Sequence, residues 1–277
     1  MERGRWTLLS GICVGEAAMS GFALVCLSET LPDFRRIADE LDDQLDDPRA
    51  DVIVRMGTTW GVLLEGLAEG VARICEQRLR LLGVPVVVVA DDDLVEPPEP
   101  TVLKSARLDS ESLSFTERGV ETSVPWDEFV YVDLIAVLRV QKVTYEEYSF
   151  DADSEGGGSK SRTPRRGITT TTPVQLVAVS HEPWLQLRVE VDGFRYGETG
   201  LPLRPNRTLN LLALSREIAG RSKRAHVGPL LQGPEPEMVP RPTPIPGEAV
   251  AAHRLRWRLT CLYRGLRPPV ELPDAPG

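Results

Sequence analysis

The chain has 277 residues, of which 42% are hydrophobic, and a formal net charge of −9. This length suits two modest domains or one large one, and the apolar content is sufficient for globular cores. The acidic balance argues against general affinity for nucleic acid, and the aromatic content of 6% argues against platforms that stack single-stranded bases.

The N-terminal segment, residues 1–20, has two arginines and then a short apolar run that Gly11, Gly15 and Glu16 interrupt. A charged start before an apolar run is typical of a signal peptide, but the interruptions favour a weakly ordered extension. We therefore expect a weakly ordered extension at residues 1–20. Met19 lies directly before the first predicted strand, and a true start codon there would also account for the extension. No apolar run reaches the roughly 18 residues that a membrane-spanning helix needs.

Residues 21–95 are expected to form one α+β domain. Residues 21–45 contain a strand and then apolar residues at helical spacing. Over 50–94 we predict a strand, a hairpin, a second strand, a helix and a third strand, because 52–54 are β-branched and Gly57 permits a turn. This order matches a ferredoxin-like βαββαβ sandwich. Two helices would cover one face of a four-stranded antiparallel sheet, and the other face would need a cover or a partner.

The predicted first helix is strongly acidic, with eight acidic residues against two arginines over residues 29–47. A solvated face that resists aggregation is one interpretation, and a docking surface for a basic partner is the other. The pairs Asp42–Asp43 and Asp46–Asp47 have no neighbours that would complete a metal site. Asp91–Asp93 follow the last strand without a phosphate-binding glycine loop, and we assign them no site.

The four cysteines are predicted to be reduced and structural. None belongs to a CxxC pair, and none lies near a histidine at metal-ligand spacing. Such thiols fit a cytoplasmic protein. The four are Cys13, Cys26, Cys75 and Cys261.

A stiff linker at 96–100 leads into a second, β-rich domain, residues 101–224. Apolar and polar residues alternate along 185–192, which is the clearest strand pattern in the chain. Residues 151–167 are rich in glycine, serine and mixed charges, so we predict a disordered insert there. A helix with Asn206 as its N-cap is expected to end this domain.

Three segments of the second domain resemble a bacterial pleckstrin-homology-like domain. They are RLDSESLSF from Arg107, SVPWDEFVYVDL from Ser123 and NRTLNLLALSREIAG from Asn206. The resemblance covers less than half of the chain and implies a bent β-sandwich closed by a helix, with a binding or scaffolding role. The basic loops of a phosphoinositide site are missing, and Arg165–Arg166 in the predicted insert is the nearest candidate.

The tail, residues 228–277, begins with a proline-rich segment that favours extended polyproline conformations. This segment would be a passive linker or a docking ligand. Residues 248–266 follow with the pattern of a short basic helix. We consider four arrangements for this tail: disorder, packing on the acidic first helix, binding of a partner, and contact with an anionic membrane.

The sequence gives no support for catalysis. It contains no HExxH, GxSxG or P-loop signature, and His181, His226 and His253 lie in separate segments. Ser180–Glu182 are sequence neighbours, whereas the members of a catalytic triad approach one another from separate elements. The adjacent carboxylates Asp127–Glu128 point to opposite faces of a strand. We therefore predict no catalytic, cofactor-binding or metal-binding residue.

The function predicted from the sequence is a non-enzymatic protein-interaction or regulatory module in the cytoplasm. Its partner would be a protein, not nucleic acid, and its oligomeric state is open. One alternative is a peripheral membrane or lipid-sensing module that acts through the β-rich domain or the basic tail. Another is a small-ligand-binding protein or enzyme that uses the open face of the N-terminal sheet.

Overall fold

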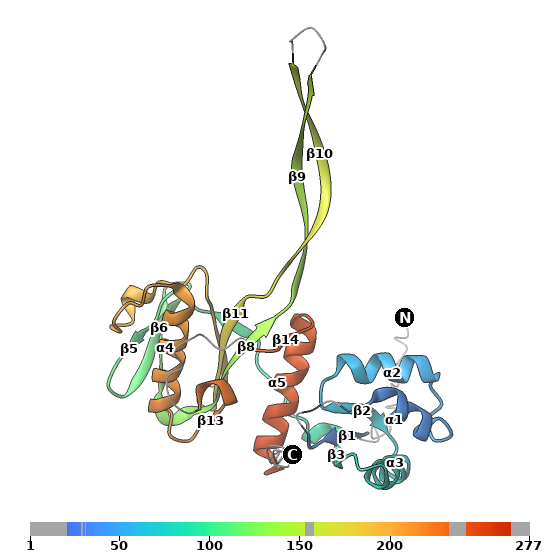
Figure 1. Cartoon of the computed structure of the whole chain (residues 1–277). Coiled ribbons are helices and arrows are strands. Elements are labelled where there is room, and N and C mark those ends of the chain that lie inside the picture. The colour runs from blue at the N-terminus through green and yellow to red at the C-terminus, as the bar shows by residue number, and fades with distance from the viewer. Residues whose placement is uncertain (1–20, 29, 31, 153–157, 233–241, 267–277) are drawn as a thin grey trace, which may run out of the picture.

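The computed structural model describes residues 21–28, 30, 32–152, 158–232 and 242–266. The chain is mixed α+β, as predicted. It forms an N-terminal unit, a β-rich unit and a long two-stranded arm, with helix α5 (Glu248–Tyr263) between the two units (Figure 1). The predicted weakly ordered extension and part of the proline-rich linker lie outside the described residues.

The N-terminal unit has a three-stranded antiparallel sheet in the order β2–β1–β3. Three helices cover one face, and the core between them contains Leu24, Leu63 and Leu79, all fully buried. The elements are β1 (Phe22–Cys26), α1 (Phe34–Leu41), α2 (Arg49–Thr58), β2 (Val62–Leu67), α3 (Glu69–Leu81) and β3 (Val86–Ala90).

The segment that we predicted as the first strand of the hairpin is helix α2. Val52 and Met56, one helical turn apart, face the core, while Val54 between them is 65% exposed. Burial of one helical face therefore outweighs the strand preference of the β-branched residues at 52–54. The element order is βααβαβ, so the described residues do not form the predicted ferredoxin-like βαββαβ sandwich with its fourth strand.

The β-rich unit has two sheets and helix α4 around a second core. One sheet has the order β5–β6–β7, and the other has the order β13–β8–β11–β12–β4, with β14 also paired to β8. The strands are β4 (Pro100–Val102), β5 (Arg107–Leu108), β6 (Ser112–Glu117), β7 (Val120–Pro125), β8 (Phe129–Val137), β11 (Val174–Ser180), β12 (Leu185–Glu190), β13 (His226–Val227) and β14 (Pro244–Ile245). Helix α4 is Arg207–Arg221, with Asn206 as the predicted N-cap, and the 3-10 turns are Asp91–Asp93, Trp126–Glu128, Tyr196–Glu198 and Pro229–Leu231.

Strands β9 (Arg139–Ala152) and β10 (Gly158–Thr171) form a hairpin that projects from the rest of the molecule (Figure 1). They pair antiparallel from Arg139 opposite Thr171 to Ala152 opposite Gly158. We call this hairpin the arm. The predicted disordered insert at 151–167 is therefore corrected: apart from 153–157, which lie outside the described residues, it supplies the ends of the two strands. Cross-strand pairing orders a segment whose composition cannot build a core.

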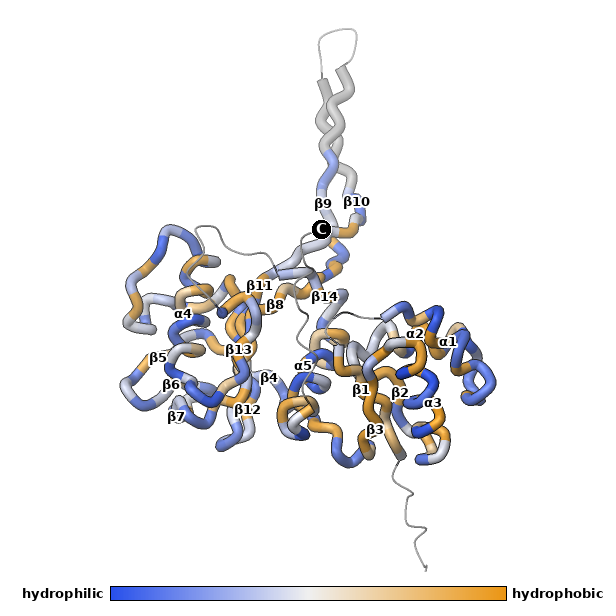
Figure 2. Tube along the Cα trace, turned by 60° about the horizontal axis from the view of Figure 1, so that its bottom comes forward, coloured by the Kyte–Doolittle hydropathy of each residue, from blue (hydrophilic) through white to orange (hydrophobic). Residues whose placement is uncertain are grey.

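Helix α5 packs against a sheet on each side. Leu255 and Leu259 contact the sheet of β8 and β11, while Trp257 and Cys261 contact the sheet of β1 and β2. The basic helix expected in the tail is thus present, and it is buried. It covers the face of the N-terminal sheet that the sequence left open. Figure 2 shows hydrophobic residues along the strands of both units, while the described part of the arm is mostly hydrophilic.

Candidate functional site

Polar residues at the start of α5 fix the helix to the β-rich unit. Glu248 accepts hydrogen bonds from Arg139 Nε at 2.9 Å and from Arg188 Nη1 at 2.9 Å. Arg139 also donates to Glu190 at 2.7 Å, and this bond holds the pKa of Glu190 below its ordinary value. Because Arg139 is the first residue of β9, the network connects α5 to the base of the arm.

Other polar contacts fix α5 to the N-terminal unit. Arg256 pairs with Glu65 of β2 at 2.6 Å and with Glu96 of the linker. Arg264, just beyond the helix, pairs with Asp93. Two arginines of the predicted basic tail, Arg256 and Arg264, thus pair with carboxylates of the N-terminal unit and the linker.

A buried tyrosine and a buried aspartate lie beneath α5. The Tyr131 hydroxyl donates to Asp133 at 2.9 Å, and the Leu134 amide donates to the other carboxylate oxygen at 2.8 Å. Burial raises the pKa of Asp133, while the charge of Arg254 opposes the rise. A Cβ atom at Gly228 would lie 1.7 Å from an Asp133 oxygen, so the chain passes too close for any side chain there. The pair lies within the sheet under α5, and Tyr131 also lines the small cavity beside that helix.

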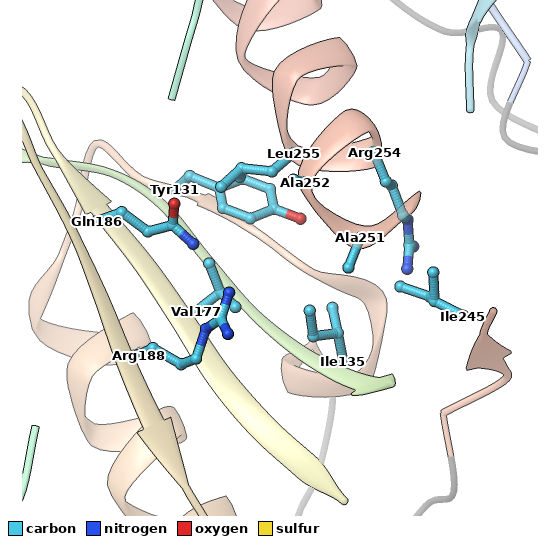
Figure 3. A pocket seen from close by; sticks show the side chains of 10 residues that line it. All are labelled: Tyr131, Ile135, Val177, Gln186, Arg188, Ile245, Ala251, Ala252, Arg254 and Leu255. Atoms are coloured by element: carbon cyan, nitrogen blue, oxygen red, sulfur yellow. The ribbon is translucent and has the colours of Figure 1, made fainter. Parts of the chain in front are cut away.

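The cavity between α5 and the sheet of β8, β11 and β12 is small. Figure 3 shows Tyr131, Gln186, Arg188 and Arg254 around it among apolar side chains. Its volume is about 20 Å³, which is room for about one water molecule. The cavity therefore cannot admit an organic ligand without movement of α5.

A wider hollow lies at the other end of α5. It has a volume of about 350 Å³ and is lined by Val95, Glu96, His181, Trp184 and Tyr263. The Tyr263 hydroxyl and His181 Nδ1 are 3.1 Å apart. The rings of Trp184 and Tyr263 meet edge to face, with centroids 5.9 Å apart. Two aromatic walls beside a carboxylate suit a cationic group.

The arm is the most exposed element of the described structure. The side chains of Val140, Tyr145 and Ile168 are 63%, 52% and 72% exposed. Neither β9 nor β10 has a second neighbour among the described strands, so each has one unpaired edge. At about 3.3 Å per residue, the two strands extend roughly 45 Å. An isolated two-stranded hairpin is marginally stable in water, and unpaired edges invite another strand.

The two edges of the arm differ. On β10, Pro164 has no N–H to donate, and Arg165 and Arg166 follow it directly. Gly167 weakens this strand further, although the Tyr145 ring lies close to it. From residue 140 to 147, β9 contains neither proline nor glycine. The edge of β9 is therefore the better one for pairing.

The residues that the sequence singled out for chemistry do not meet in one site. His181 contacts Tyr263, while His226 stacks on Tyr131 in a different layer. Ser180 donates to the carbonyl of Pro183 at 2.6 Å and is not aimed at a histidine. The described residues contain no group of three or more His, Cys, Asp or Glu side chains that could hold a metal ion.

Asp91 after β3 and Trp126 before β8 both make contacts that stabilise the fold. Asp91 accepts the Gly66 amide at 3.0 Å and lies where a Cβ of Gly21 would clash. Trp126 is buried, and its indole donates to the Asp109 carbonyl at 3.1 Å. The tryptophan before β8 is thus a core residue. Neither position forms a binding site.

The acidic first region is partly neutralised by arginines of its own unit. Asp43 pairs with Arg78 at 2.5 Å, and this contact lowers the pKa of Asp43. Asp47 likewise pairs with Arg55 at 2.8 Å. These exposed pairs contribute little stability individually. They leave less negative charge on this surface than the sequence indicates.

Sequence reasoning missed the arm and the position of α5. A signal for the arm was available, because β-branched and aromatic residues stand on both sides of the glycine run at 156–158. The sequence contains no such signal for the position of α5, because its two apolar sides pack against sheets that are far away in the sequence. No helix in the described part of the chain is long and apolar enough to cross a membrane.

Comparison of the chain with protein-family models, with curated proteins and with solved structures finds no match in any of the three.

Proposed function

We propose that this protein is a non-enzymatic protein-interaction module in which a folded body presents the arm as its docking element. The observation that carries the proposal is the arm itself, with exposed Val140, Tyr145 and Ile168 and an unpaired edge on β9. Strand addition to an exposed edge is a common mode of peptide and protein recognition. The backbone supplies hydrogen bonds, and alternate side chains supply specificity.

The contacts within the body are consistent with a role in holding the arm in place. Contacts from Glu248 to Arg139 hold the base of the arm against α5. The order of strands followed by α4 is consistent with the pleckstrin-homology-like resemblance, which implies a scaffold. The proposed protein therefore has a pleckstrin-homology-like β-rich domain and is located in the cytoplasm.

Two surfaces that the alternatives could use, the basic tail and the open face of the N-terminal sheet, are occupied by contacts within the chain. A membrane contact through the basic tail needs free arginines, but Arg256 and Arg264 are paired and Arg254 lies 5.2 Å from the Trp60 ring centroid. A ligand site on the open face of the N-terminal sheet needs that face, and Trp257 of α5 occupies it.

The direct test removes the arm and leaves the body. An Asn-Gly turn in place of residues 141–169 would join Val140 to Thr170. We expect an unchanged circular dichroism spectrum and a Tm within a few degrees of the full chain, because the arm contributes little to either core. A partner captured by the full chain, identified and purified, should bind that chain in calorimetry and not the armless one.

A matched control substitutes the exposed acidic surface, with Asp46→Asn and Asp51→Asn together. This variant should bind the purified partner as the unmodified chain does. Equal binding by the armless chain would contradict the proposal, and loss of binding in the control would move the docking surface to the acidic helices.

A second candidate function is favoured by the aromatic hollow at His181, Trp184 and Tyr263. Its chemistry suits a quaternary or methylated ammonium group, and Glu96, which also pairs with Arg256, belongs to its lining. Titration with tetramethylammonium should quench tryptophan fluorescence in the unmodified chain and not in Tyr263→Leu. No saturable change below about 10 mM, a weak affinity by any standard, would exclude this function.

A further inference from the structure

We infer that the partner of the arm is a second copy of this chain, joined through the outer edge of β9 into a four-stranded antiparallel sheet of order β10–β9–β9–β10. This inference rests on the proposed function, because it names the occupant of the same surface. It comes from a self-complementary pattern around Thr144.

The pattern is a short palindrome of chemical types. Residues 142–146 read Lys-Val-Thr-Tyr-Glu. When two copies run antiparallel with Thr144 opposite Thr144, Lys142 of each copy meets Glu146 of the other. Val143 of each copy then meets Tyr145 of the other. Opposite charges and aromatic–β-branched pairs are both favourable in directly opposed cross-strand positions.

Geometry restricts the register to few choices. Side chains that oppose each other across an antiparallel pair lie on the same face, so paired residues differ in number by an even amount. A two-fold axis through Val143 would place Lys142 opposite Thr144, and an axis through Tyr145 would place Thr144 opposite Glu146. Of these three axes, the one through Thr144 pairs Lys142 with Glu146. The axis through Val143 would instead place Arg139 opposite Glu147, but Arg139 is already bonded to Glu190 and Glu248, and Glu147 to Arg165.

The side chains around Thr144 can be reached from solvent. Lys142, Thr144 and Glu146 are exposed, and Tyr145 is 52% exposed. The competing edge on β10 is unsuited to self-pairing, because Pro164 lacks an N–H and the neighbouring Arg165–Arg166 would meet like charge. The arm thus has one edge that is blunted and one that is open.

The shape of the molecule permits the contact. The arm projects away from both units (Figure 1). At its base the edge is covered, because the Leu138 amide donates to the Ile245 carbonyl and Arg139 bonds to Glu248, whereas Val140 beyond it is 63% exposed. In the Thr144 register, the two Arg139 residues would lie roughly 33 Å apart along the joined strands, at about 3.3 Å per residue. The two bodies would then stand at opposite ends of the joined arms.

The contact is isologous, which gives a closed dimer and not a filament. The same β9 edge serves both copies and is used up by the pairing, and the outer edges that remain are those of β10, which Pro164 interrupts. Strand-edge pairing in each arm also relieves the exposure that makes a lone hairpin marginal.

The test is a charge-swap series measured by sedimentation equilibrium on the full chain. Lys142→Glu alone and Glu146→Lys alone each turn two attractive pairs into two repulsive ones, and we expect the dimer Kd to rise about tenfold or more. The double variant K142E/E146K restores both pairs in swapped order and should dimerise as the unmodified chain does. An equimolar mixture of the two single variants should form a heterodimer.

Two controls separate this contact from general effects. Lys223→Glu makes the same change in net charge at an exposed position beyond α4, and it should leave the Kd unchanged. Under mild oxidation, Thr144→Cys should form a disulfide-linked dimer, because the two residues face each other at the axis, and Thr170→Cys on β10 should not.

The outcomes distinguish this inference from the proposed function. A monomer at all concentrations, unchanged dimerisation of Lys142→Glu, or no heterodimer from the mixture would overturn the inference. If the chain is monomeric and the arm still binds a different purified protein, the proposed function stands without the second copy. If the armless chain dimerises as the full chain does, the inference fails, and the proposed function fails with it only if the armless chain also binds the purified partner as the full chain does.

Discussion

At the residue scale, the contact between Gly61 and Trp257 joins the last helix to the first sheet. Gly61 has a φ of +83°, and a Cβ there would lie 2.4 Å from the Trp257 ring. The Trp257 indole also donates to the Cys26 carbonyl at 2.7 Å. The glycine and the tryptophan therefore depend on each other, although 196 positions separate them in sequence, from 61 to 257.

The first prediction compares two glycine-to-alanine substitutions. Gly61→Ala should lower the free energy of unfolding by roughly 2–4 kcal/mol, because it adds a clash and a strained backbone. Gly57→Ala should raise it by about 0.5–1 kcal/mol, since that position lies within α2 and has no atom within 4 Å. Urea unfolding measures both, and equal effects would contradict the position of Trp257.

The second prediction concerns acid. Because the hydrogen bond from Arg139 lowers the pKa of Glu190 from 4.5, the ionised carboxylate stabilises the fold above that value. This contribution is lost as the pH falls through the lower, folded-state pKa. Between about pH 5 and pH 3, Glu190→Gln should therefore lose less stability than the unmodified chain. Parallel stability curves for the two proteins would contradict this assignment.

At the element scale, α5 covers one apolar face of each of two sheets. The third prediction is that a chain ending at Pro246 will bind a hydrophobic dye and unfold roughly 10 °C or more below the full chain, since it exposes both apolar faces. A chain ending at Leu266 keeps α5 and should behave as the full chain. Scanning calorimetry with dye binding measures both. An unchanged Tm after removal of α5 would contradict its role.

The elements that local pattern alone determines could be predicted from the sequence. Helix α3 with Cys75 and Leu79 on its buried side, strand β12 with its alternation, and the Asn206 cap of α4 all depend on neighbours a few residues away. The prediction that the chain has no catalytic site comes from the absence of known motifs in the sequence.

Other elements depend on contacts that no local pattern contains. Val52–Val54 have strand preference, but Val52 and Met56 together bury a helical face, so the tertiary core decides. The arm is ordered by pairing between residues on either side of a polar glycine run, which composition describes as disorder. The burial of α5 depends on two sheets that are separated from it by most of the chain.

At the scale of the whole molecule, the structure consists of a packed body and an arm that projects from it. Sheets, helices and α5 form a closed, well-packed body, in which the cavity under α5 holds about 20 Å³. The arm carries exposed apolar side chains and an open edge beyond that body. We therefore propose that the arm carries recognition, that the body holds the arm in place, and that the edge of β9 is the contact surface.

The most direct measurement of that claim is amide hydrogen exchange of the full chain at several protein concentrations. If β9 pairs with a second copy, the amides in 140–147 that face away from β10 should slow as concentration rises. The outward amides of β10 should exchange quickly throughout, and Lys142→Glu should remove the effect. Outward β9 amides that exchange equally fast in dilute and concentrated protein would contradict the account.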